Sequence, residues 1–137
     1  SGTFLWARTW GGSESDFGNG IDVDGSGIAY VTGTFSDTVD FNPDPLADDP
    51  HSSNGGTDIF LSKFDSSGTS SWATTWGGSD FDSGYGAAVY ESGYSYVSGS
   101  FRGASVDFNP DPTADDLHSS NGDRDAFLSK FNPDGGW

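Results

Sequence analysis

The chain has 137 residues and a formal net charge of −16, with 21 acidic residues against five Lys and Arg. This length fits one domain, and the charge argues against nucleic-acid binding because phosphates would be repelled, so cations are the expected partners. The absence of any apolar run near the length of a membrane span predicts no membrane insertion. The chain has no cysteine, which excludes disulfides and thiolate sites. A composition rich in Gly, Ser, Thr, Asn and Asp suggests an extracellular or cell-surface location.

The segment WARTWGGS at residues 6–13 returns as WATTWGGS at residues 72–79. Matching residues lie 66 positions apart early in the repeat and 67 apart later in it. Self-similarity at a fixed period indicates modules that bury their apolar faces only against neighbouring modules. We therefore expect two repeats, residues 1–71 and 72–137, with Trp137 beginning a further repeat.

Each repeat contains four short stretches of alternating apolar and polar residues, and Gly interrupts almost every run. No window has apolar residues at helical spacing, so we expect no helix. The expected strands cover residues 5–10, 20–24, 29–35 and 59–64 in the first repeat and 71–76, 86–90, 95–101 and 126–131 in the second.

Glycine-containing hairpin turns are expected at residues 24–27, 65–68 and 91–93. The turn at residues 65–68 leads from the fourth strand of the first repeat into the tryptophan strand of the second. Each tryptophan strand should therefore pair with the fourth strand of the preceding repeat. Residues 36–58 and 103–125 are expected to form long loops.

The predicted core is aromatic, because the chain has 11 Phe, five Tyr and five Trp and aromatic rings bury much surface per residue. Four-stranded antiparallel modules are typical of propeller blades, and a closed ring needs roughly four to eight of them. The expected fold class is therefore all-β, with two four-stranded blades that form part of a larger propeller, a tandem array or a homo-oligomeric assembly. The Trp6 strand would pair with the Phe131 strand across each junction, since open strand edges invite association.

Several stretches resemble the bacterial seven-bladed propeller-type repeat (SBBP) family. They are GGSESDFGNGIDVDGSGIAYVTGTF, VDFNPDP and TDIFLSKFDSSGTSSWATTWGG in the first repeat, and YSYVSGSF, VDFNPDP and DAFLSKF in the second. The resemblance implies propeller blades in large secreted or surface-anchored proteins of bacteria or archaea, most of them without a known activity. One departure is that Ala88-Val-Tyr90 stands where the first repeat has Asp22-Val-Asp24.

The VDFNPDP loops are the strongest candidates for a metal site. Oxygen side chains at alternating positions of an irregular loop can converge on one centre, and Ca²⁺ takes six to eight oxygen ligands. Proline replaces the turn glycine of an EF-hand loop and no helices flank the segment, which excludes an EF-hand. The predicted ligands are Asp40, Asn42, Asp44, Asp48 and Asp49, and in the second repeat Asp107, Asn109, Asp111, Asp115 and Asp116. The alternative is a series of Asx turns on a solvated surface.

A second set of acidic residues includes Asp16 and Asp82. These carboxylates are expected either to cap backbone amides or to form structural ion pairs with Lys63 or Lys130, which occupy equivalent positions among apolar neighbours.

Nothing in the sequence predicts an enzyme. His51 and His118 lie one repeat apart and therefore on separate blades, which disfavours a shared zinc site, and no G-x-S-x-G motif is present. Each acidic cluster recurs with the repeat, which an asymmetric active site seldom does.

The predicted function is an extracellular, calcium-stabilised structural scaffold, filament or adhesive at the cell surface, which assembles with further copies of the same repeat. The alternative is a lectin-like propeller that binds surface glycans through tryptophans. Periodic aromatic residues of this kind are more often inter-blade core than ligand site.

Overall fold

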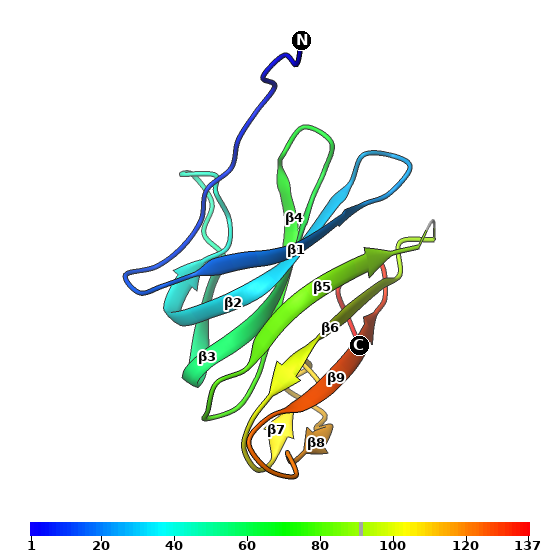
Figure 1. Ribbon diagram of the computed structural model, residues 1–137. Helices are drawn as coiled ribbons and strands as arrows, with labels where there is room; N and C mark the ends of the chain where they lie inside the picture. Colours follow the sequence, from blue (N-terminus) through cyan, green and yellow to red (C-terminus); the bar gives the residue numbers. More distant parts are fainter. Residues whose placement is uncertain (91) are drawn as a thin grey trace.

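The computed structural model describes residues 1–90 and 92–137 (Figure 1). Glu91, which was predicted to open the third turn, lies outside the described residues. The described part of the chain contains β-strands and no helix, arranged as antiparallel sheets of four, three and two strands. The predicted all-β class is therefore confirmed.

The first sheet has four strands in the order β1-β2-β3-β4. The strands are β1 (Phe17–Val23), β2 (Ala29–Asp40), β3 (Pro50–Phe64) and β4 (Ser70–Trp76). In the β3 to β4 pairing, Ser62 lies opposite Ala73 and Lys63 lies opposite Trp72. The tryptophan strand of the second repeat thus pairs with the last strand of the first repeat, as predicted.

The second sheet repeats this pattern with one strand fewer among the described residues. Its strands are β5 (Ser83–Val89), β6 (Ser95–Phe101) and β9 (Asp125–Phe131), in the order β5-β6-β9. A separate two-stranded ladder joins β7 (Val106–Asp107) to β8 (Leu117–His118). Strand β9 therefore forms the outer edge of its sheet, whereas its counterpart β3 has a strand on either side.

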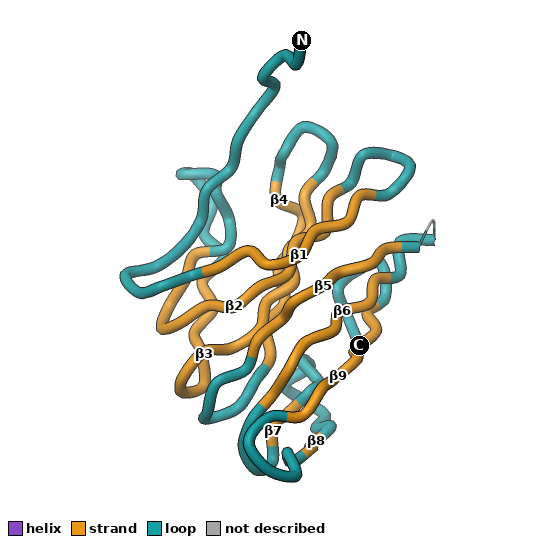
Figure 2. Tube along the Cα trace, in the orientation of Figure 1, coloured by secondary structure: helices purple, strands orange, loops and turns teal. Residues whose placement is uncertain are grey.

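The structure corrects two predictions. Residues 5–10 do not form a strand and run as an extended coil (Figure 2), because no strand lies beside them to complete a ladder. Residues 36–58 are not one long loop, because β2 and β3 continue through Asp40 and from Pro50 and leave only residues 41–49 as their connection. Val39 is fully buried and pairs with His51 in this extended hairpin.

Two of the predicted turns depend on glycine. The Gly27 amide donates to the Asp24 carbonyl at 3.0 Å, and the Gly68 amide donates to the Asp65 carbonyl at 2.9 Å. Gly27 and Gly68 have φ values of 80° and 79°, in the left-handed region that glycine adopts without strain.

The main core lies between the two larger sheets. Tyr30, Ile59 and Leu61 of the first sheet contribute to one buried cluster with Val97, Phe101 and Phe131 of the second sheet. Trp76 joins this cluster, with its ring 4.8 Å from that of Phe131. Strand β4 therefore pairs with one sheet and packs its tryptophan onto the other.

Strands β1 and β5 lie side by side in Figure 1. A Cβ atom at Gly20 would lie 2.7 Å from the Tyr85 carbonyl oxygen, so glycine is required for this close approach.

A second core cluster lies on the other face of the first sheet and contains Phe35, Val39, Phe41 and Phe60. Trp10 packs against it, with its ring 5.0 Å from that of Phe64. Trp10 thus occupies the place on the first sheet that Trp76 occupies on the second. Among the described residues, no helix is long and apolar enough to cross a membrane.

Candidate functional site

The first acidic loop is organised by hydrogen bonds within the loop. Asp40 Oδ1 accepts from the amides of Asn42 at 3.0 Å and Asp49 at 2.9 Å, and these bonds lower the pKa of Asp40 below its ordinary value. Asn42 Oδ1 accepts from the Asp44 amide, and Asp44 Oδ1 accepts from the Leu46 amide, both at 3.0 Å. These contacts are successive Asx turns.

The second loop repeats this arrangement. Asp107 Oδ1 accepts from the amides of Asn109 and Asp116, both at 2.9 Å, and Asn109 Oδ1 accepts from the Asp111 amide at 2.9 Å. The hydroxyl and amide of Thr113 donate to Asp111 at 2.7 and 2.9 Å and lower the pKa of that carboxyl. The same sequence therefore folds in the same way in both repeats.

The remaining predicted ligands do not converge on the loop centre. Asp49 and Asp116 lie 3.2 and 3.1 Å from the Nε2 atoms of His51 and His118. Asp48 and Asp115 are exposed. In the described part of the chain, no three His, Cys, Asp or Glu side chains gather in a group that could hold a metal. Within these loops, the hydrogen bonds match the Asx-turn alternative.

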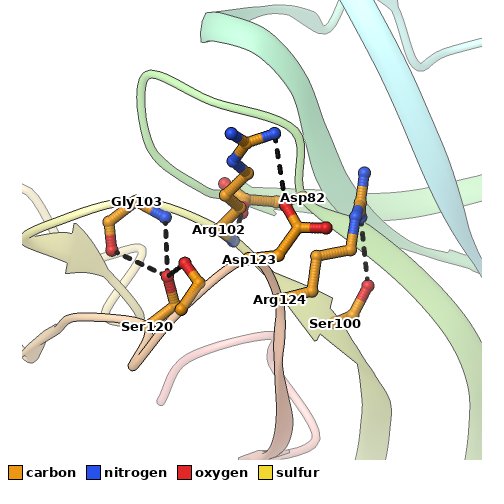
Figure 3. A network of polar contacts seen from close by, with 8 residues as sticks. Asp82, Ser100, Arg102, Gly103, Ser120, Asp123 and Arg124 are labelled. Atoms are coloured by element: carbon orange, nitrogen blue, oxygen red, sulfur yellow. Dashed lines mark hydrogen bonds and ion pairs between the residues drawn. The ribbon is translucent and has the colours of Figure 1, made fainter.

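A pair of buried carboxylates lies between the two larger sheets. Asp58 on β3 is 1% exposed and Asp82, just before β5, is 0% exposed. Asp82 accepts from the amides of Gly78 at 2.7 Å and Arg102 at 2.9 Å. Figure 3 shows Asp82 beside Arg102, whose guanidinium reaches Asp123 at 3.3 Å. Of the two roles expected for Asp82, the structure thus shows the capping of backbone amides.

Asp58 is less well satisfied than Asp82. Its Oδ2 atom accepts from the amide and the side chain of Asn54, each at 3.0 Å, whereas its buried Oδ1 atom has no hydrogen-bond partner. A Cβ atom on Gly77 would lie 2.6 Å from Asp58 Oδ1 and 2.9 Å from Asp82 Oδ2, so both carboxylates border the same glycine.

Burial shifts the ionisation of both carboxylates. Burial raises the pKa of Asp58 to about 7, and the charge of Asp82 adds to this rise against the hydrogen bonds from Asn54. Burial also raises the pKa of Asp82 above its ordinary value. Both shifts favour the protonated form of these carboxyls relative to an exposed aspartate.

Asp16 is the counterpart of Asp82 in the first repeat. It accepts from the amides of Gly12 at 2.7 Å and Ser36 at 3.2 Å, so of its two expected roles it also takes the capping one. The sequence signal for this role is the recurrence of the aspartate at the same place in both repeats.

Among the described residues, the expected ion pairs of Asp16 and Asp82 with Lys63 or Lys130 are not found. Lys63 Nζ donates to the Pro133 carbonyl at 2.9 Å and lies 5.7 Å from the Trp72 ring centre. Lys130 Nζ lies 4.7 Å from the Tyr94 ring centre. Both lysines therefore lie over aromatic rings, an arrangement that favours a cation.

The tryptophans pack in the core between the sheets or against turns. Trp76 is 3% exposed, which supports a core role for this residue. The Nε1 atoms of Trp6 and Trp72 donate to the carbonyls of Ser66 and Pro133, both at 3.3 Å. Each tryptophan thus contacts the turn that follows the fourth strand of a repeat.

A groove of about 320 Å³ lies beside β9. Its lining includes Phe108, His118, Asn121, Phe127 and Leu128. The groove combines aromatic and aliphatic surface with an imidazole and an amide.

No family model matches this chain. No similar protein is found among curated proteins.

Proposed function

We propose that this chain is an extracellular structural scaffold built from propeller-type blades of the SBBP kind, with no enzymatic activity. The observation that carries the proposal is the sharing of β4 between the sheets. This strand completes the first sheet and places Trp76 in the core against the second. Modules joined in this way stack in series, and each one needs a neighbour to cover its apolar face.

Assembly with further copies of the same repeat follows from this arrangement, and the product is a larger propeller or a filament. Light scattering or native mass spectrometry of the purified chain tests the assembly. We expect particles of several chain masses, in proportions that rise with concentration. A single-chain mass across the whole concentration range would remove the assembly proposal.

We propose that Ca²⁺ stabilises the scaffold through the two VDFNPDP loops. The net charge of −16 supports this, because bound cations reduce the repulsion within and between modules. Asp44 and Asp111 are exposed and accept backbone hydrogen bonds from Leu46 and Thr113. Calcium ligation requires these carboxylates to add metal contacts to their Asx turns.

Thermal unfolding in calcium and in excess chelator tests the metal proposal. We expect calcium to raise Tm by several degrees and chelator to reverse the change. The double variant Asp44→Asn and Asp111→Asn should lose most of this response while keeping its Tm in chelator. Identical melting curves with calcium and with chelator would contradict calcium stabilisation.

A second candidate function is a lectin-like module that binds surface glycans. The observation that favours it is the exposure of several aromatic side chains in the second repeat, since aromatic faces stack on sugar rings. These residues are Tyr85, Tyr90, Tyr94 and Trp137, which are 40% to 69% exposed. Tryptophan fluorescence should then respond to titrated glycans, and the absence of any response across a glycan panel would exclude this function.

A further inference from the structure

The groove beside β9 has a counterpart in the first sheet that is already filled. There, β4 lies along β3, and Thr75 Oγ1 lies 3.0 Å from His51 Nδ1. The Asn54 side chain donates to the Gly77 carbonyl at 3.2 Å, just beyond the end of β4. In the second repeat, His118 and Asn121 line the unfilled groove. The groove therefore carries the counterparts of the polar groups that contact β4 and the residue after it in the first sheet.

The N-terminal tryptophan segment (residues 5–10) has the side chains that β4 uses. Trp6, Ala7, Thr9 and Trp10 match Trp72, Ala73, Thr75 and Trp76 of β4. The segment is already extended, and no strand pairs with it in the described part of the chain.

Arg8 is the one difference from β4 within this match, since β4 has Thr74 there. Arg8 Nε donates to the Gly68 carbonyl at 2.7 Å, so its side chain is held at the β3 to β4 turn. The Arg8 side chain therefore lies against the β3 to β4 turn of its own chain.

The exposed face of the first sheet and the exposed face of the second sheet also match the surfaces that pack together inside the chain. Ala87 and Val89 of β5 pack into the core between the sheets, and their counterparts in the first repeat are Ile21 and Val23. Ile21 and Val23 are 63% and 51% exposed. At the other end of the molecule, Leu128 is 72% exposed, whereas its counterpart Leu61 is fully buried in the junction. The exposed face with Ile21 and Val23 and the exposed face with Leu128 thus correspond to the two surfaces that meet at the junction between the sheets of one chain.

We propose that the N-terminal tryptophan segment of one copy adds to β9 of a second copy as a fourth strand, antiparallel and in the register of β4 on β3. This inference rests on the proposed scaffold function and identifies the partner and the surface. The register places Ala7 opposite Ser129, Trp6 opposite Lys130 and Trp10 opposite Ala126, by equivalence with the observed β3 to β4 pairs. Such a head-to-tail contact forms a ring where the rotation closes and a filament where it does not.

Two further aspartates, Asp125 and Asp16, have the hydrogen bonds of the buried pair Asp58 and Asp82 and support the same assembly. Asn121 donates its amide and its side chain to Asp125 at 3.0 and 2.8 Å, as Asn54 does to Asp58. Asp16 already accepts from the Gly12 amide, as Asp82 does from the Gly78 amide. Joining two copies brings Asp16 of one to Asp125 of the other and completes a second buried pair.

Disulfide trapping tests the register, because the chain has no native cysteine. Directly opposed residues in antiparallel strands have Cβ atoms about 4.5–5.5 Å apart, close enough for trapping. The A7C chain mixed with the S129C chain should form a disulfide-linked dimer under mild oxidation. The T9C chain mixed with the S129C chain, two residues out of register, should give several-fold less. Equal yields, or a higher yield for the second mixture, would overturn the register.

A variant on β9 tests the proposed docking surface without depending on cysteine chemistry. Leu128→Arg changes an exposed side chain, so the fold should be retained, and association should weaken by about tenfold to hundredfold. Leu46→Arg is the matched control, because Leu46 is 92% exposed on the acidic loop and should leave association unchanged. Equal association of the two variants would overturn the proposed face.

The two proposals fail in different ways. If the unmodified chain has a single-chain mass at every concentration, both the scaffold assembly and this interface are wrong. If it assembles but A7C and S129C do not link, the scaffold stands and this interface is wrong.

Discussion

Strands β3 and β9 have closely similar sequences and very different surroundings. Leu61 on β3 is fully buried, whereas Leu128 at the equivalent position on β9 is 72% exposed. The difference arises from the neighbours, because β3 has β4 on its outer edge and the second sheet against its face. Burial in this protein is therefore a property of the junction between modules rather than of the module alone.

The comparison of β3 with β9 also concerns the risk of aggregation and the stability of each repeat. An exposed leucine and an open strand edge are common aggregation risks in β-proteins. On β9 they lie together, next to a groove that a strand can fill. We infer that the second repeat is less stable than the first as long as no further strand covers β9. Three predictions test this difference.

The largest expected effect comes from removing the equivalent leucines. Leu61→Ala should lower the free energy of unfolding by about 2–5 kcal/mol, since it leaves a cavity in the junction core. Leu128→Ala should lower it by less than about 0.5 kcal/mol at dilutions where the chain is single, because the side chain is already exposed. Urea unfolding followed by tryptophan fluorescence measures both variants. Equal losses would contradict the view that burial is set by the junction.

The next effect concerns the buried carboxylates and has a defined pH dependence. The pKa of Asp58 is raised from 3.8 to about 7 in the folded chain, so the folded state binds more protons than the unfolded state between these values. The contribution of Asp58 to stability is therefore fully present below about pH 4 and is lost as pH rises through 7.

Asp58→Asn should raise the free energy of unfolding by about 1–3 kcal/mol at pH 8, because a neutral amide replaces a buried charge. The asparagine keeps an acceptor for Asn54 and can donate toward Asp82, which fills the position of the orphaned oxygen. The variant should also lose stability less steeply between pH 5 and 8. Asp125→Asn is the matched control and should have a smaller effect on the isolated chain, since Asp125 is only half-buried. A loss of stability in Asp58→Asn at pH 8 would contradict the view that the buried charge of Asp58 destabilises the folded state.

Much of the fold follows from local sequence features. Strand β6 has the predicted limits, because Gly and Ser residues bound a clear alternation there. The pairing of β4 with β3 also follows from the sequence, since the turn at Gly68 leaves little other choice. The extension of β2 and β3 was missed because residues 36–40 and 50–58 are polar and contain Asp, Asn and Gly, which are typical of loops.

The candidate sites were harder to predict. The acidic loops attract attention because their oxygens alternate, yet Asx turns produce the same spacing as metal ligands. Asp58 and Asp82 belong to different repeats, and no local spacing indicates that they meet over Gly77. The signal that could have found them is the recurrence of each in the other repeat, as Asp125 and Asp16.

The smallest expected effect compares the two equivalent lysines. Lys63 is held at the junction by the Pro133 carbonyl and by two aromatic rings, whereas Lys130 is exposed and lies over tyrosines of its own sheet. Lys63→Met should lower the free energy of unfolding by about 1 kcal/mol, since the carbonyl and the rings lose their cation.

Lys130→Met should change the free energy of unfolding by less than about 0.5 kcal/mol at dilution, because water already solvates the ammonium group. Urea unfolding of both variants in low and high salt separates the two positions, since a half-buried cation is screened less than an exposed one. A larger loss for Lys130→Met than for Lys63→Met would show that the β9 edge is already covered in the isolated chain. The contrast between the repeats would then have to come from something other than the open junction.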